Sequence, residues 1–279
     1  MRGFGASFRA RIDDLARHPL TYISLIAVAG AAWVVAREES IRDNGYIVYE
    51  AGLQAGARAA AFFLLAISAL AVASHRTRGT VRWLLPRPVS RAAFVIGQAA
   101  AHALLALLLL AAAVLPAWAA AAPFGFGDVV TAVEGDEDDA AFHYIEEEAI
   151  EPEFTAAAMR GRAVQATLLL LPAFLAAAGL GLFVSSLLAS AAGAVILAVA
   201  IALPLVYLPE VLGLSADTAR ALPFRAAMDF LDQLREFGRH FNTAEWPGYG
   251  ATGWGGALAA CIGLPALAAL LFGLLDITE

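Results

Sequence analysis

The side chains that most often perform chemistry in proteins are few in this sequence and form no catalytic pattern. The five histidines are scattered, and the single cysteine, Cys261, lies in an apolar run, so no disulfide can form within the chain. Zinc-type Cys/His spacing, an HExxH sequence and an ordered Ser–His–Asp set are all missing from the sequence. There is no lysine, so all 18 basic residues are arginine, whereas a P-loop needs a lysine on the nucleotide phosphates. We therefore expect no catalytic residue, no metal site and no cofactor in this chain, and any ATP-driven work must come from a partner.

Two polar residues stand out inside an apolar run. Gln98 and His102 are one helical turn apart within it. An ionisable residue inside a membrane span is a functional-site hypothesis by default. A neutral histidine that is hydrogen-bonded within a helical bundle accounts for the same pattern, and we favour that interpretation.

The densest group of basic residues lies between two apolar runs, in the segment 75–91. Its arginines are Arg76, Arg78, Arg82, Arg87 and Arg91. Such loops most often serve only to fix the orientation of a membrane protein. They can also transmit a displacement from a partner if the backbone between the two spans is rigid.

The sequence of this segment predicts a short, rigid helix. Val81, Leu84 and Leu85 can share one apolar face, while Arg78 and Arg82 are spaced i,i+4 on another. Pro86 and Pro88 then end the helix, because proline removes a backbone donor and disfavours helix in the residue before it. Ser90 is placed to cap the next helix at its N-terminus.

The elements that hold this segment are predicted to be membrane-spanning helices. The chain of 279 residues is 61 % hydrophobic and only 15 % charged, whereas a soluble domain has roughly 25 % charged residues. A span needs about 20 apolar residues. We predict a single all-α integral membrane domain with six spans, at about 20–36, 54–74, 92–118, 163–184, 188–208 and 254–275.

An amphipathic helix is predicted before the first span, over about residues 4–17. Phe4, Phe8, Ile12 and Leu15 recur at helical spacing, with the arginines largely on other faces. Such a helix lies in the membrane interface, with its arginines toward anionic headgroups. Arginine density near the span ends favours both termini inside, which leaves residues 123–162, rich in acidic side chains, and 209–253 outside.

The basic segment resembles that of the type-2 family of ABC exporter permeases. The resemblance is carried by Arg78-Gly79-Thr80, then Leu84-Leu85, then Arg87-Pro88-Val89-Ser90-Arg91 and Gly97. Family members have a Gly-Thr, a Leu-Leu, a Pro-Val-Ser-Arg and a following Gly-Lys in corresponding places after the second span. They also have an elbow helix before the first span, six spans, and a serine-containing turn after the fourth, where this chain has Ser185, Ser186 and Ser190. The chain departs from the pattern at His75 and Thr77, where glutamates are common, and at Gln98 in place of lysine.

This resemblance implies a multi-pass subunit of a prokaryotic cytoplasmic membrane that exports an unknown substrate. A separate nucleotide-binding subunit would bind ATP and Mg and would contact residues 76–91, and two permeases, identical or different, would pair in the bilayer. No nucleic acid partner is expected. A non-transporting membrane scaffold is the alternative, and a secondary transporter is less favoured, because the sequence shows neither clear inverted repeats nor broken mid-membrane helices.

Overall fold

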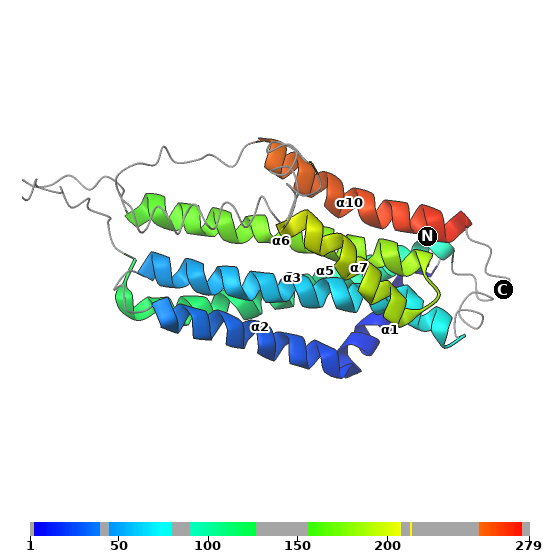
Figure 1. Ribbon diagram of the computed structural model, residues 1–279, viewed down its shortest axis with the longest axis horizontal. Coiled ribbons are helices and arrows are strands. Elements are labelled where there is room, and N and C mark those ends of the chain that lie inside the picture. Colours follow the sequence, from blue (N-terminus) through cyan, green and yellow to red (C-terminus); the bar gives the residue numbers. More distant parts are fainter. Residues whose placement is uncertain are drawn as a thin grey trace, which may run out of the picture.

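The computed structural model describes residues 3–39, 45–79, 90–126, 156–207, 213 and 251–274. Every regular element in these parts is a helix, which agrees with the predicted all-α class (Figure 1). The elements are α1 (Phe4–Arg17), α2 (Pro19–Glu38), α3 (Gly45–Thr77), α5 (Arg91–Ala121), the 3₁₀ helix η2 (Ala122–Phe124), α6 (Ala156–Leu187), α7 (Ala191–Tyr207) and α10 (Ala251–Leu274).

Four of the described helices are long and apolar enough to cross a membrane. They are α2, α3, α5 continued by η2, and the part of α6 from Ala163 to Leu187. The apolar stretches of α7 and α10, Ala191–Pro204 and Leu258–Leu274, are shorter. The structure therefore agrees with a helical membrane protein, while the count of six spans and the orientation stay predictions.

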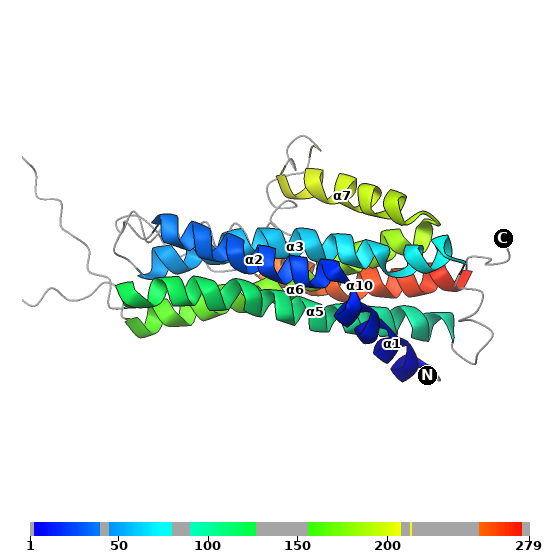
Figure 2. The same cartoon turned by 90° about the horizontal axis from the view of Figure 1, so that it is seen from below.

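The helices form an elongated bundle with α3 and α5 at its centre, and α5 packs against α1, α2, α3, α6 and α10. α3 has a similar set of neighbours. This helix packs against α2, α5, α6 and α7, while α10 packs against α6 and α5. The long helices run along the same axis, and α1 turns away from it at one end (Figure 2). The C-terminal end of α10 lies at that same end of the bundle (Figure 1). α1 and the C-terminal end of α10 thus lie at one end of the bundle, while the side of the membrane that this end faces stays a prediction.

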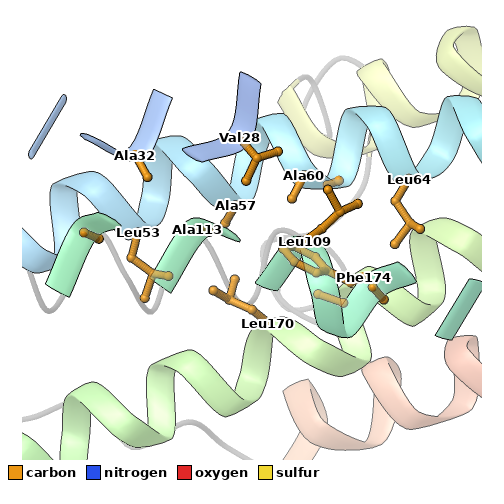
Figure 3. Packing of buried hydrophobic residues seen from close by; sticks show 14 of the residues in the cluster. Val28, Ala32, Leu53, Ala57, Ala60, Leu64, Leu109, Ala113, Leu170 and Phe174 are labelled. Atoms are coloured by element: carbon orange, nitrogen blue, oxygen red, sulfur yellow. The ribbon is translucent and has the colours of Figure 1, made fainter. Parts of the chain in front are cut away.

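Small residues bring α2, α3 and α5 together at the centre of the bundle. A Cβ added to Gly56 of α3 would lie 2.8 Å from the Cβ of Ala113 in α5 and 3.0 Å from that of Ala32 in α2. One turn away, a Cβ on Gly52 would lie 2.7 Å from the carbonyl oxygen of Ala32. Small residues spaced by four allow helix backbones to approach this closely in membranes. Leu53, Leu109, Leu170 and Phe174 fill the space beside the contact (Figure 3).

Two helices extend beyond the spans predicted from hydropathy. α3 begins at Gly45, nine residues before the predicted span start at 54, and α6 begins at Ala156, inside the segment predicted to lie outside. Glu50 and Gln54 lower the hydropathy of the first turns of α3, yet both are buried in the bundle. Packing, which hydropathy does not measure, therefore sets the start of this helix.

The corner between α1 and α2 is made by His18 and Pro19. His18 has an extended backbone with φ −82° and ψ 124°, which ends α1, and Pro19 is the first residue of α2. Proline suits this position because the backbone donor it lacks would have no partner within the helix there. The His18 Nδ1 accepts a hydrogen bond from the backbone N–H of Leu20 at 3.2 Å, so the same residue also caps α2. The helix predicted at 4–17 is thus present as α1, and its placement in the membrane interface stays a prediction.

Candidate functional site

The C-terminal end of α3, which leads into the basic segment, is tied to the turn between α6 and α7. The Thr77 hydroxyl lies 2.8 Å from the carbonyl oxygen of Ala189 and accepts a hydrogen bond from the N–H of Ala191 at 3.1 Å. Arg76 donates from Nη1 to the carbonyl oxygen of Ser186 at 3.1 Å. Because Ala191 is the first residue of α7, Thr77 supplies a cap for a helix more than a hundred residues away in the chain.

A second contact joins α3 and α6 one turn earlier. The Ser185 Oγ accepts hydrogen bonds at 2.9 Å from the backbone N–H groups of both Val72 and Ala73. Close approach of the two helices depends on Gly181, because a Cβ there would lie 2.6 Å from the carbonyl oxygen of Leu65 and would also meet Ser68. Ser185 is fully buried. The end of α3 is therefore joined to the end of α6 by buried hydrogen bonds as well as to the α6–α7 turn.

Gly79 ends α3 in the left-handed conformation. Its φ is +66°, and its N–H donates to the carbonyl oxygen of Arg76 at 3.0 Å, while the N–H of Arg78 donates to Ser74 at 3.1 Å. Glycine adopts this backbone at no steric cost and is common just after a helix C-terminus. The glycine of the predicted motif thus lies just after the C-terminal end of α3.

At the other end of the segment, the first residues of α5 are fixed to α10. Ser90 is the N-cap of α5, as predicted, since its Oγ accepts a hydrogen bond from the N–H of Ala93 at 3.1 Å. Arg91 donates from Nη1 to the carbonyl oxygen of Gly273 in α10 at 3.2 Å. The ring of Phe94 lies 5.9 Å from those of both His75 and Phe272. Both ends of the basic segment are therefore anchored to other helices.

α1 packs on the bundle through a face that the apolar pattern predicted only in part. Leu15 belongs to the core, and Phe8 and Ile12 pack against it, but polar residues share this face. The buried residues of α1 are Ser7, Arg11 and Leu15, whereas Phe4, Phe8 and Ile12 remain partly exposed. The sequence reading placed Arg11 toward lipid headgroups with the other arginines of this helix. That expectation is wrong, because the Arg11 side chain is only 7 % exposed and points into the bundle.

The Arg11 guanidinium reaches both α3 and α5. Its Nη2 lies 3.2 Å from the carbonyl oxygen of Ile67 and 3.2 Å from Nε2 of His102. Arginine carries only donors, so His102 must accept at Nε2. Its proton is then on Nδ1, which donates to the carbonyl oxygen of Gln98 at 2.7 Å. The expectation of a neutral, hydrogen-bonded histidine inside the bundle follows from this geometry, and His102 is fully buried.

Burial and a nearby carboxylate act on Arg11 in opposite directions. Removal from water lowers the pKa of Arg11 to about 10, and the attraction of Asp14 opposes the shift. The guanidinium remains charged at neutral pH, so α1 carries a permanent cation into the bundle.

Gly97, the last residue of the predicted motif, is where α1 crosses α5. A Cβ at this position would lie 2.8 Å from both Cβ and Oγ of Ser7 and 3.0 Å from the backbone nitrogen of Phe8. The Ser7 hydroxyl donates to the carbonyl oxygen of Phe94 at 3.0 Å. A residue larger than glycine would therefore push α1 away from α5.

The predicted site residues divide into those the structure describes and those it does not. Arg76, Arg78, Gly79, Ser90 and Arg91 lie at the two ends of the segment, and Gln98 and His102 lie inside the bundle beneath α1. Six further residues of the predicted contact lie outside the described residues: Thr80, Arg82, Leu84, Leu85, Arg87 and Pro88. The short helix expected there is untested.

Sequence reasoning missed the polar residues that join the helices. In the sequence, Thr77 stands out only as a departure from the family pattern, and Ser7 belongs to no motif. A single serine in an amphipathic segment carries no signal by itself. The repeat Ser7, Arg11, Leu15, at spacing i,i+4, could have indicated the packed face of α1, but two of its members are polar.

The comparison with protein-family models agrees with the motif and with the fold. Residues 16–274 match the model described as "ABC-2 family transporter protein", which is most of the chain. The chain belongs to the ABC-2 family of transporter proteins. No curated protein matches it. As an ABC-2 permease, the chain is a multi-pass membrane subunit of an ABC transporter, a system that in general includes an ATPase partner.

The matched region of this ABC-2 permease begins at Ala16, close to the end of α1. It contains the whole of the Thr77–Ala189 junction and the contact between Arg91 and Gly273. The packed face of α1 lies before it. The attachment of α1 through Ser7 and Arg11 is therefore known from the structure and not from the family comparison.

Proposed function

We propose that this ABC-2 permease is the membrane-spanning subunit of an ATP-driven exporter, powered by a separate nucleotide-binding subunit that contacts residues 76–91. ATP and Mg would be bound by that subunit, and this chain would hydrolyse nothing. Two permeases, identical or different, would pair in the cytoplasmic membrane of a prokaryote. The observation that supports this proposal best is the anchoring of both ends of the basic segment to different helices.

A displacement of the segment would reach five helices at once: α3, α5, α6, α7 and α10. At its start, Thr77 and Arg76 hold the α6–α7 turn, and at its end, Arg91 holds α10 through Gly273. α3 and α5 are continuous with the segment itself. A loop that served only to fix orientation would need none of these contacts. The arrangement is suited to passing a push from a soluble partner into the bundle.

α1 provides a second route into the same helices. Arg11 joins it to α3 and α5, and Ser7 joins it to α5. A partner that moved α1 together with the segment would act on α3 and α5 from two sides.

Affinity purification of the chain from its native membrane in mild detergent tests the proposal. We expect a soluble subunit with a Walker-A lysine to co-elute in a stoichiometric amount and to hydrolyse ATP. Elution of a folded chain without any ATPase would overturn the proposal and would favour the scaffold or secondary-transporter alternative.

A further inference from the structure

A cavity of about 380 Å³ lies between α1, the first turn of α2 and the C-terminal part of α3. Its size is within the range of small-molecule sites. It borders the contact site of the proposed function, because Thr77 and Arg78 line it, but most of its lining residues take no part in the contacts that anchor the basic segment. We refer to it as the α1–α3 pocket.

The charged side chains of the α1–α3 pocket are mostly basic. They are Arg11, Arg17 and Arg78, with His18 and His75, against one carboxylate, Asp14. The Asp14 Oδ2 lies 4.0 Å from Nε2 of His75. Three permanent cations face one anion, so the pocket favours a negatively charged ligand even when both histidines are neutral.

Arg11 is the deepest of these cations and is incompletely hydrogen-bonded. Its Nη2 contacts Ile67 and His102, but its Nε has no hydrogen-bond partner in the described part of the protein. A buried donor without a partner costs free energy, more so when it is charged. Because Arg11 also lines the pocket, a negatively charged ligand there would stabilise its buried charge. Arginine suits phosphate oxygens because its planar fork donates two parallel hydrogen bonds.

Much of the remaining wall of the pocket is apolar, although Ser74 and Thr77 also line it. The apolar part is formed by Leu15, Pro19, Leu20, Ile67 and Leu70. A freely soluble anion such as inorganic phosphate has no apolar part that could contact these side chains. Arg17 and Arg78 are exposed cations of the lining, so the pocket offers both charged and apolar groups to the same ligand.

The surface next to the pocket is also suited to lipid. Tyr22, Ile23 and Ile26 follow in the next turns of α2 and are 55 %, 52 % and 73 % exposed. α2 and α3 are both apolar enough to cross a membrane, and the pocket lies at one end of each. In a bilayer crossed by both helices, headgroups would lie at the level of the pocket and acyl chains along the exposed face of α2.

We propose that the α1–α3 pocket binds the phosphate-bearing headgroup of an anionic phospholipid. Basic pockets between membrane helices are a known means of recognising such headgroups. The bound lipid would fasten α1 to the end of α3, next to Thr77, which caps α7. The inference does not depend on the transported substrate or on the identity of the ATPase.

Native mass spectrometry of the purified chain tests this proposal. The chain is placed in a neutral detergent with phosphatidylglycerol or phosphatidylcholine of identical acyl chains. We expect one phosphatidylglycerol to be retained in preference to phosphatidylcholine. Either Arg17→Gln or Arg78→Gln should weaken this retention about fivefold. An arginine near anionic headgroups contributes about 1 kcal/mol of binding free energy, which corresponds to that factor. Both residues are exposed, so neither variant should unfold the chain, which a thermal melt verifies.

Arg9→Gln is the matched control, because Arg9 is an exposed arginine of the same helix that does not line the pocket. It should leave the retention of phosphatidylglycerol nearly unchanged. Two results would overturn the proposal: equal retention of the two lipids, or a loss of phosphatidylglycerol in Arg9→Gln as large as in the pocket variants. Either would show only non-specific attraction between arginines and lipid. Displacement of the lipid by an equal concentration of glycerol phosphate would assign the pocket to a soluble phosphate compound instead. Weakened ATPase binding in Arg17→Gln with unchanged lipid retention would assign it to the protein partner.

Discussion

Arg11 of α1 donates a hydrogen bond to His102 of α5, with 3.2 Å between Nη2 and Nε2. The two residues are far apart in the sequence. Arg11 belongs to the helix that precedes the candidate spans, and His102 belongs to one of those spans. Because His102 can accept only as the neutral tautomer protonated at Nδ1, the contact fixes the state of the histidine as well as the position of α1. This pair attaches the N-terminal helix to the helices that carry the basic segment.

Replacing His102 by leucine should destabilise the protein. The substitution removes one of the two acceptors of a buried guanidinium, and a lost hydrogen bond to a charged group costs about 1.5 to 3 kcal/mol. We expect a lower melting temperature in detergent by circular dichroism. The double variant Arg11→Met with His102→Leu removes the charge along with its acceptor, so it should be more stable than the sum of the single changes predicts. Additive losses would mean that the two side chains do not interact.

Gly97→Ala should detach α1 from α5. The new Cβ would lie 2.8 Å from the Ser7 side chain, and overpacking of this kind costs about 1 to 3 kcal/mol. Gly30→Ala is the control, because a Cβ on Gly30 meets nothing within 4 Å and alanine favours a helix over glycine. Hydrogen exchange of α1 should rise in Gly97→Ala and stay constant in Gly30→Ala. Equal exchange in the two variants would refute the packing account.

Thr77→Val should loosen the first turn of α7. The change keeps the shape of the side chain but removes the hydroxyl that accepts from the N–H of Ala191. The loss of this cap should cost on the order of 1 kcal/mol. It should also raise amide exchange at residues 191–194. Thr167→Val removes a comparable bond, from Thr167 to Tyr49 at the other end of α3, and should leave exchange in α7 unaffected. A similar rise in both variants would indicate general destabilisation.

Gly181→Ala should separate α6 from the end of α3. A Cβ at this position would meet Ser68 and the backbone of Leu65 and Ala69, where little can give way. Gly263→Ala, in α10, adds the same group into open space. We expect only the first change to lower the melting temperature, because overpacking of this kind lowers the free energy of unfolding by about 1 to 3 kcal/mol. An unchanged melting temperature in Gly181→Ala would contradict the close crossing of α3 and α6.

Hydropathy and motif spacing predicted the helical membrane class, the family and the cap at Ser90. These features depend on local composition, which a sequence shows directly. Hydropathy failed at Glu50 and Gln54, which are polar but buried in the first turns of α3. It failed again at Arg11, because a charged residue on an amphipathic helix is ordinarily solvated. In each case the partners come from helices distant in the sequence, so only the packed bundle reveals them.

Thr77 and Ser185 illustrate the same limit at the candidate site. Each bonds to backbone atoms of another helix, and backbone acceptors and donors leave no trace in residue types. The basic segment itself was recognisable because its arginines, prolines and glycine carry local signals. The contacts that anchor it could not be recognised, because they depend on residues that are distant in the sequence.

The most direct test of the account is whether the basic segment binds and drives the partner ATPase. The double variant Arg78→Glu with Arg82→Glu reverses two charges in the segment, while Arg9→Glu with Arg160→Glu reverses two exposed charges in α1 and α6. Both variants should insert into the membrane as the natural chain does. We predict that the first variant loses the co-purifying ATPase or its coupled ATP hydrolysis and that the second retains both. If the ATPase binds and hydrolyses ATP equally well with Arg78 and Arg82 reversed, the segment only fixes orientation and the proposed coupling is wrong.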